Sequence, residues 1–158
     1  MLTSINTILC AVDLNADTDL TTLFMTMSLA EKYQAQVTVL HVIEPIDASI
    51  YAWGSMEAWD EIEKNALDRA LAAIDEQVSQ FCDKELAQGE NTHLPDVKVI
   101  QGHVAKSILG CADDINADVI IMGSNGHNVI GGLLLGSVAD KVIRSSSRPV
   151  LLVPILAA

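Results

Sequence analysis

The chain has 158 residues, half of them hydrophobic, and a formal net charge of −12 at pH 7. This length and composition predict one compact domain, residues 1–158, with a sizeable core. The negative charge argues against nucleic acid or anionic lipid as a partner, because both bind clustered Lys and Arg. Residues 44–90 carry twelve acidic and three basic side chains, which we interpret as a solvated helix face.

The sequence predicts a cytoplasmic protein with no membrane partner. The N-terminal region lacks the basic start, apolar run and cleavage site of a signal peptide. No apolar run approaches the roughly 20 residues that span a bilayer. Three cysteines, Cys10, Cys82 and Cys111, are odd in number and far apart. We therefore expect reduced thiols in the core rather than disulfides or metal ligands.

The first part of the chain predicts two buried strands on either side of a helix. Residues 5–12 form a nearly continuous apolar run, typical of a parallel strand covered on both faces. A helix is expected over residues 17–34, and its apolar stripe comprises Leu20, Leu23, Phe24, Met27 and Ala30. A second strand is expected at residues 36–43. Pro45 follows it, and proline cannot continue a sheet ladder.

Residues 46–56 are the part of the chain that the sequence predicts least well. Trp53 in this loop and Trp59 beyond it could stack on a ligand, or pack on the domain or a partner subunit. The sequence leaves both interpretations open. From an N-cap at Ser55, a long acidic helix should run to about Gly89, and its length allows a break near Trp59. Its expected apolar stripe comprises Ile62, Ala66, Ala70, Ile74, Val78 and Phe81.

The second part of the chain alternates strands with helices. Strands are expected at residues 97–101, 117–122 and 149–153. A helix follows Gly102, and another is expected at residues 137–146. The apolar stripe of the first of these helices comprises Val104, Ile108, Cys111, Ala112 and Ile115. Five strands alternating with four helices predict an open parallel α/β sheet.

A glycine-rich segment, residues 123–137, connects the fourth strand to the last helix. Gly123, Gly126 and Gly136 have two and then nine residues between them. Glycine allows close approach of a backbone to a ligand, and N–H groups at a helix start attract anions. Ser137 adds a hydroxyl donor. The segment therefore predicts a phosphate-binding turn, and a merely flexible turn is the alternative.

Asp13, directly after the first strand, is the second candidate for ligand binding. In open parallel sheets, ligands bind beyond the carboxyl ends of strands whose connections leave toward opposite faces. If the first and fourth strands are those neighbours, Asp13 and residues 123–137 face one crevice. The carboxylate would then serve a ribose or base, and the glycine segment would hold phosphates. Together they predict a nucleotide site.

These features resemble the universal stress protein family. The pattern Gly-x2-Gly-x9-Gly-Ser at residues 123–137 is similar to the ATP-binding motif of that family. The resemblance covers essentially the whole chain, and the other matching segments are residues 8–13, 41–45, 102, 118–124, 135–144 and 148–153.

The resemblance implies a fold, an assembly and a ligand. The fold would be Rossmann-like, of the adenine nucleotide alpha hydrolase type. It would have an open five-stranded parallel sheet in the order 3-2-1-4-5, with helices on both faces. Two copies would form a homodimer through the last strand, residues 149–153. Each would bind ATP, with Mg²⁺ held largely by phosphate oxygens and water.

The resemblance also implies which residues contact ATP. Ala11, Asp13 and Val42 would contact the adenosine. Met122, Gly123 and Gly126 would line the ribose and phosphates. Gly136, Ser137 and Val138 would contact the phosphates alone.

Two positions depart from the family pattern. Asn125 stands where the family often has His, and His127 stands where it often has Arg. Because a histidine with the ordinary pKa near 6.5 is mostly uncharged at pH 7, we expect weaker phosphate binding than with Arg. We hypothesise that His127 assists triphosphate binding more at mildly acid pH than at neutral pH. A solvent-facing histidine with no role is the alternative.

The expected function is a nucleotide-dependent regulator in the stress response, acting as a homodimer. The sequence has no Gly-x4-Gly-Lys-Ser/Thr motif and no nucleophile paired with a base at the strand ends. We therefore predict no catalytic residues and at most slow ATP hydrolysis. One alternative is a weak ATPase or nucleotide-transferring enzyme of the same superfamily. The other is an interaction scaffold that binds no nucleotide.

Overall fold

A five-stranded parallel sheet forms the centre of the molecule. The computed structural model describes residues 4–14, 16–45, 55–85, 94–124 and 135–154. The strands are β1 (Thr7–Val12), β2 (Gln36–Ile43), β3 (Asp96–Gln101), β4 (Val119–Gly123) and β5 (Val150–Val153). The helices are α1 (Ala16–Tyr33), α2 (Met56–Glu85), α3 (Val104–Asp114) and α4 (Ser137–Ser145). The strand order is β3-β2-β1-β4-β5, which confirms the predicted fold class and order.

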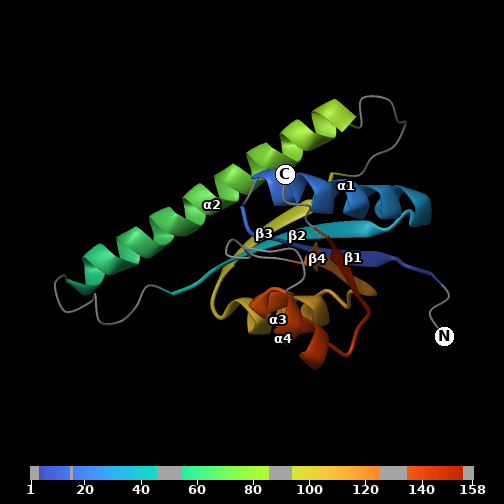
Figure 1. The fold of residues 1–158 in the computed structure, drawn as a ribbon. Coiled ribbons are helices and arrows are strands. Elements are labelled where there is room, and N and C mark those ends of the chain that lie inside the picture. The colour runs from blue at the N-terminus through green and yellow to red at the C-terminus, as the bar shows by residue number, and fades with distance from the viewer. Residues whose placement is uncertain (1–3, 15, 46–54, 86–93, 125–134, 155–158) are drawn as a thin grey trace.

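The helices cover both faces of this sheet. Figure 1 shows α1 and α2 on one face, and α3 and α4 on the other. Ile8, Cys10 and Val12 of β1 belong to the core under α1 and α2. Leu9 belongs to the core on the opposite face, and Ala11 packs against it. Successive side chains of a strand point to opposite faces, so a strand covered on both sides must be apolar throughout.

The predicted element boundaries that fall within the described residues agree with the structure to within two residues. The helix α2 is described as far as Glu85 and runs without a break past Trp59, and its expected end near Gly89 lies outside the described residues. Its predicted N-cap is confirmed, because the Ser55 hydroxyl accepts a hydrogen bond from the Ala58 backbone N–H at 3.3 Å. A side-chain acceptor there satisfies one of the N–H groups that a helix start leaves without a partner.

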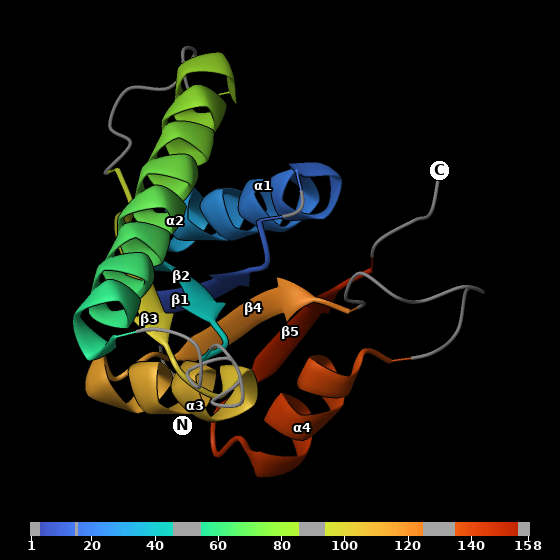
Figure 2. The same ribbon diagram turned by 90° about the vertical axis from the view of Figure 1, so that its left-hand side faces the viewer.

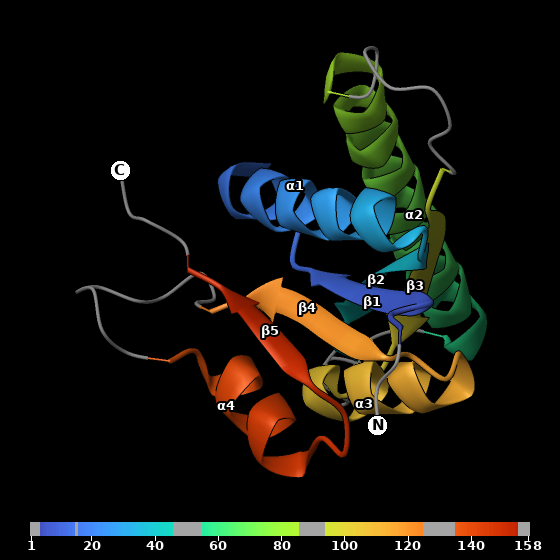
Figure 3. The same ribbon diagram turned by 90° about the vertical axis from the view of Figure 1, so that its right-hand side faces the viewer.

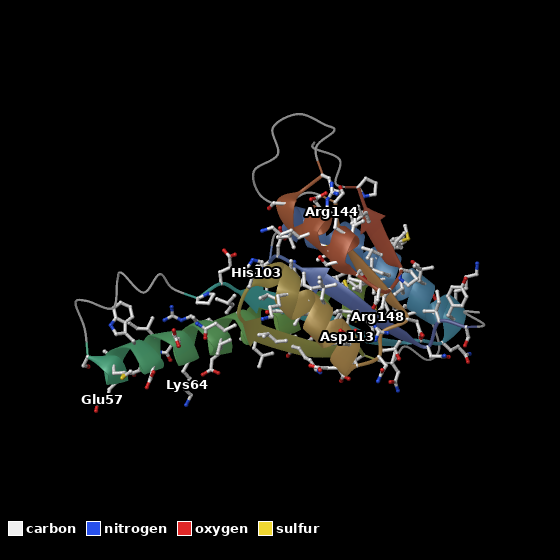
Figure 4. All side chains as sticks on the ribbon, turned by 90° about the horizontal axis from the view of Figure 1, so that it is seen from below. Glu57, Lys64, His103, Asp113, Arg144 and Arg148 are labelled. Atoms are coloured by element: carbon white, nitrogen blue, oxygen red, sulfur yellow. The ribbon has the colours of Figure 1, made fainter. Side chains whose placement is uncertain are left out.

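The apolar stripes predicted for α1 and α2 are partly wrong. Leu20 and Phe24 of α1 are 45% and 54% exposed, whereas Leu23, Met27 and Ala30 are buried. At about 100° per residue, Leu20 and Phe24 lie on the flank of α1 rather than on the face that meets the sheet. Ile62 of α2 is 44% exposed. It lies in the first half of α2, which extends beyond the sheet with Glu57 and Lys64 (Figures 1 and 4).

No helix among the described residues is both long enough and apolar enough to cross a membrane.

The long helix α2 has an acidic residue, Glu57, in its first turn. It attaches to the sheet through Ala70, Ile74, Val78 and Phe81, all of which are buried. Its expected stripe is therefore correct in its second half.

The three cysteines are buried and form no disulfide, as predicted. Burial raises the pKa of the Cys82 thiol, and the neighbouring Asp83 carboxylate raises it further. Burial also raises the pKa of the Cys111 thiol; Lys98 partly offsets this rise and Asp114 adds to it. Raised pKa values keep both thiols protonated at neutral pH, and a protonated thiol is a poor nucleophile.

We therefore expect iodoacetamide at pH 7.5 to alkylate Cys82 and Cys111 slowly in the folded protein. The rate should be at least about ten-fold lower than in protein unfolded by guanidinium, where thiolates form more readily and are accessible. Mass spectrometry of tryptic peptides over time would give the rate for each cysteine. Equal rates in the folded and unfolded protein would contradict the expectation.

Candidate functional site

β1 and β4 are neighbours, and their connections leave the sheet toward opposite faces. Ala11 of β1 is in register with Met122 of β4. The chain leaves β1 toward α1 and leaves β4 toward α4, and Figure 3 shows these two helices on opposite sides of the sheet. Such a reversal is the place where open parallel sheets bind ligands, beyond the carboxyl ends of the strands. The neighbour relation on which the predicted crevice depends is thus confirmed.

Three of the predicted residues lie on one face of the sheet at this edge. Ala11 is in register with both Leu40 of β2 and Met122 of β4, and Val42 lies two residues beyond Leu40. Residues in register and residues two apart share a face. Val42 and Met122 are buried in the core beside α3 and α4, and Ala11 packs against that core. Ala11, Val42 and Met122 thus form one apolar group, the apolar floor, at this edge of the sheet.

Asp13 lies two residues after Ala11 of this floor and is half-buried. The backbone on both sides of it is held in place. The carbonyl of Val12 accepts a hydrogen bond from the imidazole Nδ1 of His41, at 3.0 Å. Leu14 has a left-handed backbone with φ of 63°, and its side chain packs against the core under α1 and α2. His41 is half-buried and has a backbone hydrogen-bond partner at its Nδ1.

The two ends of the glycine-rich segment are tied together at the carboxyl edge. Ser124, directly after β4, donates its backbone N–H to Val153 of β5 at 2.9 Å. Its carbonyl accepts the N–H of Gly136 at 2.8 Å. This pair of bonds brings the start of α4 back beside the end of β4. Gly123 itself is the last residue of β4, in register with Val153.

The start of α4 directs backbone donors to this edge. Gly136 is the N-cap, with φ of −60° and ψ of 148°, and it has no side chain to cap the helix. Ser137 and Val138 are the first two helical residues, and their N–H groups have no partners within the helix. The positive end of the helix dipole adds to the attraction for an anion. Ser137 is exposed and Val138 is half-buried.

A second helix begins at the same edge, and sequence reasoning missed it as part of the site. α3 starts after Gly102, whose N–H donates to the carbonyl of Ile43 at 2.9 Å. Its N-cap, His103, makes no side-chain capping hydrogen bond and is exposed. Figures 2 and 4 show α3 beside α4, with His103 at the end of α3 that faces this edge. The available signal was the glycine directly after a strand.

Asn125, Gly126 and His127 lie outside the described residues, so their roles stay predictions. No group of three or more His, Cys, Asp or Glu that could hold a metal ion occurs in the described part of the chain. What the described edge offers is an apolar floor, the Asp13 carboxylate, the Ser137 hydroxyl and the amides that open α4. The chemistry of this set suits an anion joined to an apolar ring.

The chain resembles known proteins over nearly its full length. Residues 4–154 match the universal stress protein family. A universal stress protein of Thermus aquaticus is 31% identical over 126 residues, which are 78% of this chain and 81% of that protein.

Solved structures share the fold. The structure of protein MJ0577 of Methanocaldococcus jannaschii, a universal stress protein, has a TM-score of 0.71 and 27% identity; the match covers 98% of this chain and 99% of that one. A universal stress protein in complex with cAMP has a TM-score of 0.60 and 22% identity, over 98% of this chain and 100% of that one. With the family match over residues 4–154, the chain is a member of the universal stress protein family.

Proposed function

We propose that this protein binds ATP in the crevice beyond β1 and β4 and acts as a nucleotide-dependent regulator in the stress response. The observation that carries the proposal is the meeting of three features at one edge of the sheet. They are the amides that open α4, the apolar floor and Asp13. A universal stress protein of the same fold has been solved with cAMP, so this fold accommodates an adenine nucleotide in that protein.

Each group has a role that its chemistry suits. The Ser137 hydroxyl and the N–H groups of Ser137 and Val138 donate hydrogen bonds to phosphate oxygens, and such charge-assisted bonds are strong. The floor formed by Ala11, Val42 and Met122 takes the adenosine, and Asp13 accepts hydrogen bonds from ribose hydroxyls. The remaining phosphate contacts are assigned to Gly123, Gly126 and His127, as the family pattern implies.

Mg²⁺ accompanies the triphosphate in this proposal. Phosphate oxygens and water hold it, which is the usual arrangement for a small cation that dehydrates reluctantly. The ion offsets phosphate charge, which matters in a protein whose own net charge is −12. Without it, a triphosphate would approach an already negative surface. ATP should therefore bind more tightly with Mg²⁺ than with EDTA.

Titration calorimetry with Mg-ATP tests the proposal. One ATP per chain should bind, and ATP should raise the melting temperature because a ligand of the folded state stabilises that state. Mass spectrometry of a denatured extract should find ATP that co-purified with the protein. If there were no heat of binding, no shift in melting temperature and no co-purified nucleotide, these results would instead support a scaffold that binds no nucleotide. Phosphate release above that of a Gly123/Gly126 double variant would support a weak ATPase.

The proposal includes a homodimer formed through β5. This strand is at the edge of the sheet, and among the described strands it pairs with β4 alone. Leu151 on β5 is 36% exposed, and an edge strand is a template for pairing with a second chain. Analytical ultracentrifugation should give twice the mass of the chain, and Leu151→Lys should shift it toward the monomer. A monomeric wild type would exclude this interface.

A further inference from the structure

We propose that Leu14 and His41 are positioning residues that hold Asp13 in place for the nucleotide. The proposal rests on the function proposed above, because it concerns the same site. Neither residue belongs to the set of expected ATP contacts. Their effect would pass through the backbone on the two sides of Asp13.

Leu14 has a backbone conformation that leucine rarely adopts. Its φ of 63° lies in the left-handed region, where the Cβ approaches the carbonyl oxygen too closely. Such a conformation persists only where the surroundings impose it. The surroundings here are apolar, because the Leu14 side chain packs against the core that includes Val12 and Leu23. The side chain therefore acts as an anchor that fixes the first bend after Asp13.

His41 restrains the chain on the other side of Asp13. It is in register with Val12, the last residue of β1, and its Nδ1 lies 3.0 Å from the Val12 carbonyl oxygen. A carbonyl only accepts hydrogen bonds, so Nδ1 carries the proton in this contact. The half-buried imidazole thus fixes the last carbonyl of β1, one residue before Asp13.

The two restraints lie on the same side of the chain. Val12 and Leu14 both pack in the core under α1 and α2, while the apolar floor belongs to the opposite face. Asp13 stands between these two anchored neighbours, directly after the last residue of β1. A binding group needs such support, since a carboxylate misplaced by about 1 Å loses much of its hydrogen bonding.

Variants at Leu14 separate anchoring from backbone strain. Leu14→Gly suits a positive φ but has no side chain to anchor, whereas Leu14→Met keeps a long apolar side chain. By titration calorimetry, Leu14→Gly should bind Mg-ATP about ten-fold more weakly than wild type, and Leu14→Met should stay within about two-fold. Asp13→Ala should also weaken binding. In the Asp13→Ala background, Leu14→Gly should cause no further loss.

The same comparison, with and without Asp13→Ala, applies to His41. It tests the inference independently if the Leu14→Gly variant fails to fold. His41→Leu removes the donor to Val12, and His41→Asn keeps an amide N–H that can replace Nδ1. His41→Leu should weaken binding, and His41→Asn should restore it at least in part.

The outcomes distinguish this inference from the proposed function. Wild-type protein that binds no ATP would overturn both. Normal binding by Leu14→Gly and by His41→Leu, with tight binding by wild type, would overturn the inference and leave the function standing. The inference would also be overturned if Leu14→Gly or His41→Leu weakened ATP binding as much in the Asp13→Ala background as in wild type. It would likewise be overturned if Asp13→Ala by itself left ATP binding unchanged.

Discussion

Ser137→Pro should weaken Mg-ATP binding by at least about a hundred-fold while leaving the fold intact. The substitution removes the first N–H of α4 and the hydroxyl beside it, two donors to charged oxygens that contribute about 1.5–3 kcal/mol each. The helix itself tolerates proline at this position, since its first residue has no intrahelical bond for that N–H to make. Gly136 also has a ψ of 148°, which suits the residue before a proline.

Ser137→Ala is the matched control for this variant. It removes the hydroxyl but keeps the N–H, so its loss of affinity should lie between those of wild type and Ser137→Pro. Calorimetry gives the dissociation constants, and urea unfolding without ligand shows whether stability is retained. A Ser137→Pro variant that is as stable as wild type and binds ATP equally well would exclude the start of α4 as the phosphate site.

The strands were predictable because the chain marks them with local signals. The apolar run of β1 follows from burial on both faces, and Pro45 ends the strand ladder two residues after β2 (Gln36–Ile43), which was predicted at its observed bounds. The strand order could not be predicted from local signals. No local pattern indicates that β4 pairs with β1, and the expected order 3-2-1-4-5 came from the family resemblance alone. Register and neighbour choice depend on the packing of all four helices.

Apolar spacing alone overestimated the buried face of α1. Leu20 and Phe24 fit a helical stripe as well as Leu23 does, yet they remain exposed. Hydrophobic periodicity gives the side of a helix that can be buried, and the neighbouring elements determine how much of it is covered.

The parts of the site that could be predicted are those with a residue-type signal. Glycine spacing indicated the start of α4, and an acidic residue after a strand indicated Asp13. The left-handed turn at Leu14 carries no such signal, because the usual residues at positive φ are Gly, Asn and Asp. The contact between His41 and Val12 joins two strands, so no single segment reveals it.

Gly102→Ala should lower the free energy of unfolding by about 2–3 kcal/mol. Gly102 has a φ of 159°, which side-chain-bearing residues rarely adopt. A Cβ added there would also lie 2.7 Å from the Ser107 hydroxyl oxygen in the first turns of α3. The Ser107 hydroxyl would therefore have to rotate away, or the turn that joins β3 to α3 would have to shift. The hydrogen bond from the Gly102 N–H to the Ile43 carbonyl, at 2.9 Å, opposes a shift of the turn. Urea unfolding followed by circular dichroism measures the change.

Two further substitutions separate the steric part of this effect from the backbone part. Ser107→Ala removes the hydroxyl oxygen that a Cβ at residue 102 would meet. Combined with Gly102→Ala, it should restore about 1 kcal/mol of the free energy of unfolding, and the rest of the loss should remain as backbone strain.

Gly110→Ala is the matched control in the same helix. Among the described residues, no heavy atom lies within 4 Å of a Cβ added at Gly110, apart from its chain neighbours and the nearby backbone of α3. Alanine there should therefore stabilise α3 by up to about 1 kcal/mol. If Gly102→Ala were as harmless as Gly110→Ala, the turn would be free to relax. The start of α3 would then not be fixed at the edge that carries the proposed site.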